Sequence, residues 1–379
     1  MSFILRMFTL VLAALLVCGD TLSAATIART THDTGSGTSL ELWLFVGALG
    51  ATLSTSALSL LDWAKRLDPS GKIAAIVELL AQTNEILLDA KWIEGNLPTG
   101  HRTTVRTGLP QVFWRLLNQG VTPSKSTTAQ IDEQAGMLEA WSEVDKDLAA
   151  LNGNIGAFRL SEAQPFLEAM NQEMAQTIFY GNAGLAIEEF TGLAPRYSSL
   201  SAANGQNIVN GGGSGSDNSS IWLLVWGENT VSGIFPKGSK AGLVHEDRGE
   251  QIIQSSDGKR MVALMDRFQW KGGIALKDWR YAVRIANIDI SNLVAESSAA
   301  DIEKLMIKAV HRIPAMGMGT PVFYANRTVH QMLDIQARAD VKGGGGLNYE
   351  NVGGKRIVAF RGIPIRTCDA LLETEATVS

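Results

Sequence analysis

The chain has 379 residues, of which 45% are hydrophobic, so it can bury a sizeable core and is long enough for two or three domains. Its charged and aromatic fractions are ordinary, which excludes bulk disorder. The formal net charge of −5 argues against a protein that reads nucleic acid through a basic surface, although a protein that only encloses nucleic acid needs no such excess.

Residues 1–25 have the layout of a secretory signal. Arg6 supplies a positive charge, Phe8–Val17 is an apolar stretch, and Ser23–Ala25 offers small residues for cleavage. A second apolar run, Leu42–Leu61, is long enough to span a bilayer, but it contains two glycines and several serines and threonines. The same run could instead be an extended arm that leads into the first helix, and both interpretations stay open at this point.

Helices are predicted where apolar residues recur every three or four positions. The first starts at Ser70 and continues to Leu87. The second starts at a capping box, Ser161–Gln164, ends at Gly181 and carries an apolar stripe that we interpret as core. The third runs from Ser298 to Pro314, and a shorter helix over Thr328–Arg338 has Asn326 as its cap.

Strands are predicted between these helices. Thr103–Thr107 and Gln111–Leu117 read as a long two-stranded excursion between Gly95 and about Ser126. Later apolar segments predict strands at Ile221–Trp226, Val262–Trp270, Gly273–Leu276, Tyr281–Ile285, Arg356–Phe360 and Ile363–Arg366. The class is therefore α+β, with a long helix, a projecting hairpin and a terminal sheet.

The sequence shows no recognisable chemical site. The two cysteines, Cys18 and Cys368, cannot build a disulfide framework or a zinc cluster, and Cys368 is expected to be a small buried residue. No pair of the five histidines has the spacing of metal ligands. We predict no catalytic residue, no cofactor and no metal. A hydrolase that uses the glycine-rich loops, with Ser214 or His245, is one alternative.

Several stretches occur together in a recognisable order. They are Leu60–Arg66, Glu94–Pro110, Asn118–Gly120, Leu160–Asn182, Lys277–Arg280, Val283–Asp289 and Arg361–Ile365. This ordered set resembles the major capsid proteins of short-tailed bacteriophages and related prophages, whose shells use the capsid fold of phage Hong Kong 97. The resemblance covers the chain from about Ala51 to the C-terminus, and it rests on the ordered set because no single motif is diagnostic.

The resemblance implies an α+β, Hong Kong 97-like capsid fold with a long spine helix, an extended β-hairpin loop, an N-terminal arm and an axial domain. The implied divisions are an N-terminal extension (1–50), the arm and first helix (51–94), the extended loop (95–126), a peripheral domain with the spine helix at 161–181 (127–297), and an axial domain with the C-terminal strands (298–379).

The function implied by the resemblance is self-assembly into an icosahedral shell that encloses phage genomic double-stranded DNA without sequence-specific binding. The partners would be copies of the chain itself, as hexamers and pentamers, together with scaffolding, portal and decoration proteins, and no membrane. The protein would be assembled in the host cytoplasm and reside in the virion. The candidate intersubunit contacts are Trp63, Arg102, Arg106, Trp114, Arg115, Trp279 and Arg280.

Residues 1–50 depart from this family, because a shell that assembles in the cytoplasm has no use for an export signal. We hypothesise that the gene start lies too far upstream, and that translation begins near Ala51, for example at a GTG codon for Val46. The alternative takes the N-terminus at face value and makes the chain an exported or membrane-anchored bacterial protein.

Overall fold

The computed structural model describes residues 28–32, 40–44, 82–151, 153–254, 258–297, 299–339, 347–352 and 355–379. The chain forms two compact units, Met1–Ser56 with Ser255–Lys259, and Ala57–Gln254 with Arg260–Ser379. In the first unit, β1 (Ala28–His32) pairs antiparallel with β2 (Leu40–Leu44). Several predictions fall outside the described residues. They are the signal, most of the run Leu42–Leu61, Trp63 and the part of the predicted first helix up to residue 81. All that follows concerns the second unit.

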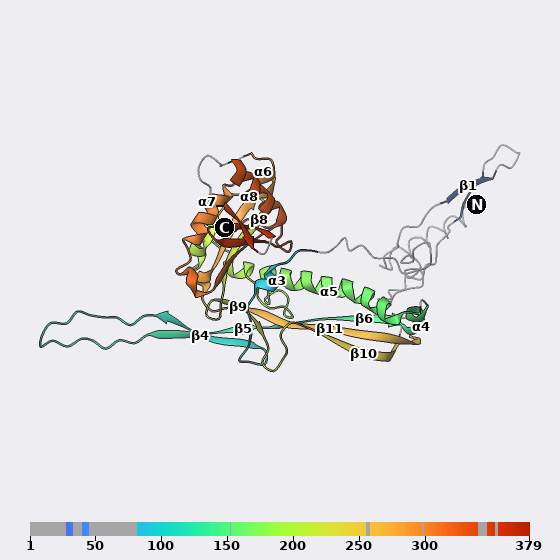
Figure 1. Ribbon diagram of the computed structural model, residues 1–379, viewed down its shortest axis with the longest axis horizontal. Coiled ribbons are helices and arrows are strands. Elements are labelled where there is room, and N and C mark those ends of the chain that lie inside the picture. Colours follow the sequence, from blue (N-terminus) through green and yellow to red (C-terminus); the bar gives the residue numbers. More distant parts are fainter. Residues whose placement is uncertain are drawn as a thin grey trace, which may run out of the picture. The chain divides into compact units, whose positions relative to one another are not determined.

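The long helix of this unit is α5, Ile155–Tyr180, whose 26 residues correspond to about 39 Å (Figure 1). The capping box at Ser161–Gln164 predicted its start wrongly, because the helix begins six residues earlier. The side chain of Asn154 caps it by accepting a hydrogen bond from the Ala157 amide at 3.1 Å. It ends at Gly181, as predicted, where a Cβ atom would lie 2.6 Å from the carbonyl oxygens of Phe190 and Thr177.

A long antiparallel sheet packs against α5. Its strands are β6 (Gly136–Asp145), β11 (Arg260–Leu276) and β10 (Leu243–Gln254), and α4 (Lys146–Ala150) follows β6. The two strands predicted within 262–276 are one strand, which exchanges its partner from β6 to β9 (Val231–Phe235) between Gly272 and Gly273. A Cβ atom on Gly273 would lie 2.5 Å from the Gln134 carbonyl oxygen, so the exchange requires glycine.

The central strand is β8 (Asn218–Trp226), in which every residue is buried. It pairs antiparallel with β12 (Ala282–Asp289) and β13 (Thr320–Ala325). Its even-numbered residues from Trp222 to Trp226 join the core beneath α5, and its odd-numbered residues from Ile221 to Val225 join a second core. Residues alternate between the faces of a strand, so β8 is covered on both sides. The second core is closed by α6 (Ile290–Val294), α7 (Ile302–Val310) and α8 (Arg327–Ala339).

Shorter elements complete the unit. They are α3 (Ile86–Asp89), β3 (Trp92–Glu94), η1 (Ala194–Tyr197), η2 (Gly205–Asn207), β7 (Ile208–Asn210), η3 (Trp279–Tyr281), η4 (Met316–Met318), β14 (Leu347–Val352), β15 (Lys355–Phe360) and β16 (Ile363–Thr367). The terminal strand pair and the helix near Thr328 are confirmed, and Asn326 caps that helix through a 3.0 Å bond from the Thr328 amide. The third helix starts later than predicted, at Ile302, because Asp301 caps it.

The predicted division between residues 297 and 298 falls within this sheet. It separates β12 from β13, although both are hydrogen-bonded to β8. The domain boundaries as a whole remain a prediction. The α+β class is confirmed, and no helix among the described residues is long and apolar enough to cross a bilayer.

Candidate assembly surfaces

A two-stranded ribbon extends away from the rest of its unit (Figure 1). It consists of β4 (Gly100–Gly108) and β5 (Thr127–Gln134), paired antiparallel from Gly100↔Gln134 to Gly108↔Thr127. We call residues 100–134 the projecting hairpin and residues 109–125 its tip. The excursion predicted for residues 95–126 therefore exists, but its second strand was misplaced. Residues 111–117 are not in a strand, and β4 pairs with a segment that follows Ser126.

The tip is exposed along its whole length, and its side chains are largely apolar. Trp114 is fully exposed, and the other exposed hydrophobic residues of the tip are Leu109, Val112, Phe113, Leu116, Leu117 and Val121. Ser124 donates a hydrogen bond to the Gln111 carbonyl at 2.6 Å, which ties the two sides of the tip together. Contiguous exposed apolar surface of this kind marks sites of protein–protein contact.

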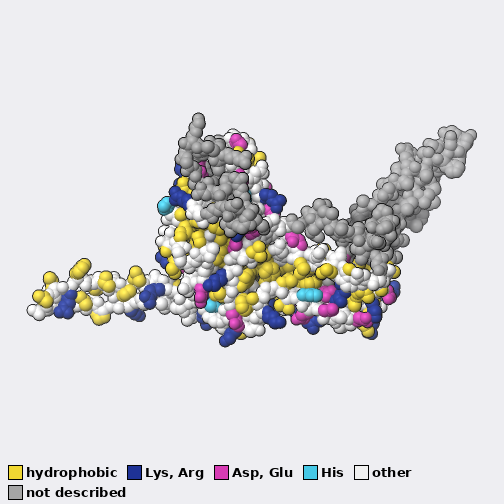
Figure 2. All heavy atoms as spheres, viewed as in Figure 1, with side chains coloured by type: hydrophobic (Ala, Val, Ile, Leu, Met, Phe, Trp, Pro, Cys, Tyr) yellow, Lys and Arg dark blue, Asp and Glu magenta, His cyan; other side chains and the backbone are white. Residues whose placement is uncertain are grey.

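Basic residues accompany these apolar side chains. Between Thr103 and Ile131 the sequence has three basic residues, Arg106, Arg115 and Lys125, and no aspartate or glutamate. Figure 2 shows hydrophobic and basic side chains distributed along the hairpin. The tip therefore presents a surface that is both apolar and positively charged.

The root of the hairpin is fixed by a buried ion pair. Arg196 donates two hydrogen bonds of 2.6 Å to the carboxylate of Glu133, which is only 7% exposed. Arg196 also donates to the carbonyls of Thr191 and Gly192, so its guanidinium joins β5 to the segment before η1. Bidentate pairs of this kind fix direction as well as distance. The hairpin is therefore anchored at its root and unsupported at its tip.

The seven predicted contact residues fall into three groups. Arg102, Arg106, Trp114 and Arg115 all lie on the projecting hairpin, where Arg102 forms an ion pair of 2.6 Å with Asp132 of the paired strand. Trp279 and Arg280 lie together in η3, where Arg280 is exposed and pairs with Asp278 at 2.7 Å. Trp63 is outside the described residues. Their role between subunits stays a prediction.

A cavity that sequence reasoning missed lies beside the hairpin root. It has a volume of about 160 Å³ and lies between the start of β6, the C-terminal half of α5 and the loop 182–190. Its lining includes Leu138, Met174 and Phe190, three glutamates (Glu173, Glu188 and Glu189), and no lysine or arginine. We call it the acidic groove. No local pattern could reveal it, because its three segments are far apart in the sequence.

Exposed apolar side chains lie beside the acidic groove, and its carboxylates form no ion pair among the described residues, although Glu189 accepts a hydrogen bond of 3.4 Å from the Asn182 amide. Leu185 and Ile187, on the same loop as Glu188, are 88% and 89% exposed. Within the described part of the chain, no ion pair joins the carboxylates of Glu173, Glu188 or Glu189 to a basic side chain. The groove therefore offers negative charge and apolar surface together.

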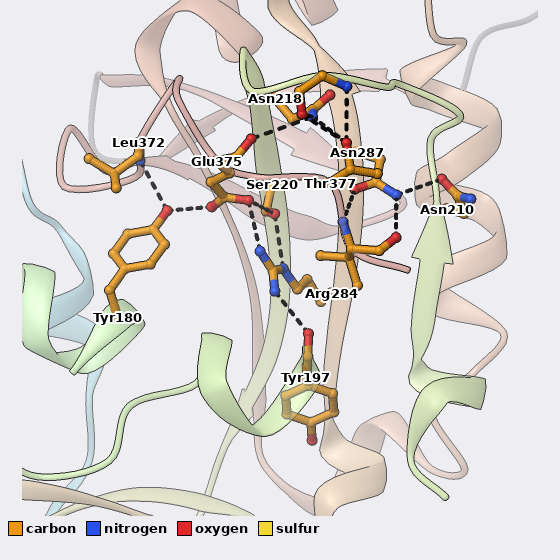
Figure 3. A network of polar contacts seen from close by, with 12 residues as sticks. Tyr180, Tyr197, Asn210, Asn218, Ser220, Arg284, Asn287, Leu372, Glu375 and Thr377 are labelled. Carbon is orange, nitrogen blue, oxygen red and sulfur yellow. Dashed lines mark hydrogen bonds and ion pairs between the residues drawn. The ribbon is translucent and has the colours of Figure 1, made fainter. Parts of the chain in front are cut away.

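The C-terminal segment is held by a buried charge pair (Figure 3). Arg284 of β12 and Glu375 are 6% and 5% exposed in their side chains, and a bond of 2.8 Å joins them. Glu375 also accepts hydrogen bonds from Ser220 and from the hydroxyl of Tyr180, whose pKa is raised by burial and by the nearby carboxylate. The sequence indicates that Arg284 has a buried partner, because it is the one charge in the apolar segment Tyr281–Ile285 and a buried charge needs a partner.

Further bonds tie down the last residues of this segment. Asn287 donates to the Val378 carbonyl at 2.9 Å and accepts from the Val378 amide at 2.8 Å, and the Leu200 amide donates to Ser379 at 2.9 Å. Asn287 has a φ of 59°, in the left-handed region that asparagine tolerates better than most residues. The segment is thus part of the folded unit.

The residues of the hydrolase alternative occupy unrelated surroundings. His245 lies on β10, where its Nε2 is 2.8 Å from Asp266 and its ring stacks on Phe268. Asp266 also pairs with Arg159 of α5 at 2.7 Å, so His245 belongs to an ion-pair cluster between sheet and helix. Ser214 is exposed in the loop after β7. Among the described residues no group of histidine, cysteine, aspartate or glutamate side chains could hold a metal ion.

Comparisons with known proteins identify the family. The family model described as major capsid protein GP7 matches residues 68–379. A chain from the structure of bacteriophage Epsilon15 is 38% identical, with a TM-score of 0.71 over 86% of this chain and 99% of that chain. The capsid of bacteriophage JBD30 is 11% identical, with a TM-score of 0.44 over 80% of this chain and 99% of that one, which is too weak to support an argument.

No curated protein matches the chain. The family model covers far more than half of the sequence, and the Epsilon15 chain aligns over almost its whole length. These findings confirm the predicted α+β capsid fold of the Hong Kong 97 type and the predicted function as a structural protein of the phage virion. The chain belongs to the family of phage major capsid proteins described as GP7.

Proposed function

We propose that this major capsid protein assembles as hexamers and pentamers into an icosahedral shell that encloses double-stranded DNA, with the projecting hairpin as the main contact between neighbouring copies. The exposed apolar tip carries this proposal. A fully exposed tryptophan among other exposed apolar residues gains nothing from the fold of its own subunit. Tryptophan and arginine are the residue types most enriched among the strongest contributors to binding, and the tip contains both.

Self-association through a projecting element produces a heterologous contact, because the tip and the surface that receives it are different parts of the subunit. Contacts of this kind close into rings when the rotation between neighbours divides a full turn. We propose Arg102, Arg106, Trp114 and Arg115 as residues of this contact, and Trp63, Trp279 and Arg280 as residues of further subunit contacts. The net charge of −5 is compatible with a shell that encloses DNA without binding it tightly.

The resemblance to phage capsid proteins also supports assembly in the host cytoplasm, with scaffolding, portal and decoration proteins as partners. The family is one of structural proteins. We propose no catalytic role.

Electron microscopy and sedimentation of the expressed chain test this proposal. The wild-type chain should form closed particles, whereas Trp114→Ser combined with Leu117→Ser should leave small oligomers. Losing a large apolar side chain such as Trp114 costs about 2 kcal/mol or more of binding free energy per contact between subunits. The same loss occurs at every contact of a ring. Ile252→Ser is the control, because Ile252 on β10 is likewise an exposed apolar residue, 71% exposed, but lies outside the tip.

Both variants should unfold at the wild-type temperature, because none of the three substituted side chains is buried in the subunit. Particle formation by the tip variant at the wild-type level would overturn the role of the hairpin. Failure of the wild-type chain to form particles under any condition would overturn the proposed assembly.

A further inference from the structure

The tip of the hairpin and the acidic groove are complementary in charge and in polarity. The tip has two basic residues, Arg115 and Lys125, and no acidic one, and the groove lining has three glutamates and no basic residue. Both surfaces also expose large apolar side chains, such as Trp114 on the tip and Leu185 beside the groove. Surfaces that match in these two respects attract and then desolvate one another.

The two surfaces cannot meet within one subunit. Gly136 lines the groove and follows β5 directly, so the groove lies at the root of the hairpin. The ladder from Gly100 to Gly108 rises about 26 Å at roughly 3.3 Å per residue, and the tip lies beyond it. The bidentate pair between Glu133 and Arg196 anchors the root. The hairpin tip of a subunit therefore cannot fill the acidic groove of that same subunit.

We propose that the acidic groove receives the hairpin tip of a neighbouring copy of this chain. This inference rests on the proposed function and names the surface to which the hairpin docks. The apolar tip residues cover Leu138, Met174 and Phe190 and the exposed Leu185 and Ile187. Arg115 and Lys125 of the tip face the groove glutamates. Each subunit inserts its tip into the groove of one neighbour and binds the tip of its other neighbour, so every groove in a closed ring is occupied.

Charge favours the tip over another segment of the same chain. Residues 45–81 contain three acidic and three basic residues, so they have no net attraction to a negative groove. The tip has a net charge of +2, from Arg115 and Lys125, and the hairpin over residues 103–131 has a net charge of +3. The three groove carboxylates lack basic partners within the described residues, which leaves them available to cations from outside.

Cross-linking between single-cysteine subunits tests the proposal. On a Cys18→Ser background the other natural thiol is Cys368, which is fully buried. Subunits with Gln119→Cys, an exposed polar position of the tip, are mixed with subunits carrying Leu185→Cys, assembled, and treated with a short bis-maleimide, in which each thiol adds across one maleimide double bond. The matched control replaces Leu185→Cys with Ile252→Cys, an exposed position on β10. We expect at least tenfold more cross-linked dimer with Leu185→Cys than with the control.

A charge exchange gives an independent readout. Arg115→Glu and Glu188→Lys should each reduce particle yield by about tenfold, because like charges then meet at the interface, and the two together should restore it. Arg115→Glu combined with Glu228→Lys, at an exposed glutamate outside the groove, should not restore assembly.

The outcomes separate this inference from the proposed function. Particles in which Gln119→Cys links to the control position as well as to Leu185→Cys, or to neither, would mean that the groove holds another occupant, and would overturn the docking inference alone. Absence of particles from the wild-type chain would overturn the proposed function and this inference with it.

Discussion

The buried pair of Arg284 and Glu375 makes a quantitative prediction about stability. In Glu375→Ala the guanidinium of Arg284 keeps its bonds to Ser220 at 3.0 Å and to the Tyr197 carbonyl at 2.8 Å, but it loses its only carboxylate partner among the described residues. Removing one member of a buried pair costs about 3–5 kcal/mol, because the remaining charge is left uncompensated. That is a large part of the roughly 5–15 kcal/mol that stabilises a typical domain.

Thermal unfolding followed by circular dichroism, before assembly, measures the effect. The midpoint should fall by on the order of 10 °C, since each kcal/mol corresponds to about 2–4 °C in a domain of this size class. Replacing both residues with methionine should be much milder than Glu375→Ala, because an apolar pair leaves no buried charge behind.

An exposed pair nearby provides the control. Arg327 pairs with Asp369 at 2.6 Å, but its side chain is 67% exposed, so Arg327→Ala should cost no more than about 1 kcal/mol. If Glu375→Ala destabilised the subunit no more than Arg327→Ala does, the C-terminal segment would not be held by this charge pair, and the reasoning would fail.

Three further predictions concern other parts of the unit. The hydrogen bond from Arg267 lowers the pKa of Glu139 to about 2 from an ordinary value of 4.5, so the stabilisation from this pair is present above pH 4.5 and is lost as the pH falls towards 2. The stability difference between wild type and Glu139→Gln in urea titrations should therefore shrink over that range, and a difference that grew would contradict the assignment. Burial raises the pKa of the Cys368 thiol to about 12, so on the Cys18→Ser background a thiol reagent at pH 8 should react only after denaturation, and rapid reaction with the native protein would refute this. In Gly233→Ala the new Cβ would lie 2.7 Å from the ring of Trp92, which should cost about 1–3 kcal/mol in thermal unfolding, whereas Gly317→Ala, with open space around it, should be nearly neutral.

The sequence predicted the elements that are stabilised by burial. The apolar spacing of Met170, Met174 and Ile178 predicted α5, and the composition of Ile221–Trp226 predicted the strand that the structure buries completely. These patterns are local, because one face of a helix or both faces of a buried strand must be apolar. The ordered motifs also led to the correct family.

Other elements lacked such a pattern. The strands β5 and β10 are mostly exposed and polar, and pairing with β4 and β11 rather than burial keeps them extended. The apolar run around Trp114 predicted a strand, yet the structure offers it no partner strand among the described residues. The acidic groove depends on three distant segments, so only the folded chain could reveal it.

The pairing of Arg284 with Glu375 also bears on when a subunit can finish folding during synthesis. The two residues are 91 positions apart, and the arginine leaves the ribosome first. Until the glutamate emerges, the guanidinium at the centre of the sheet has no counter-charge, and the nascent chain pays for its desolvation. A subunit therefore completes its interior only after Glu375 has emerged, and a shorter nascent chain cannot yet present a finished docking surface to other subunits.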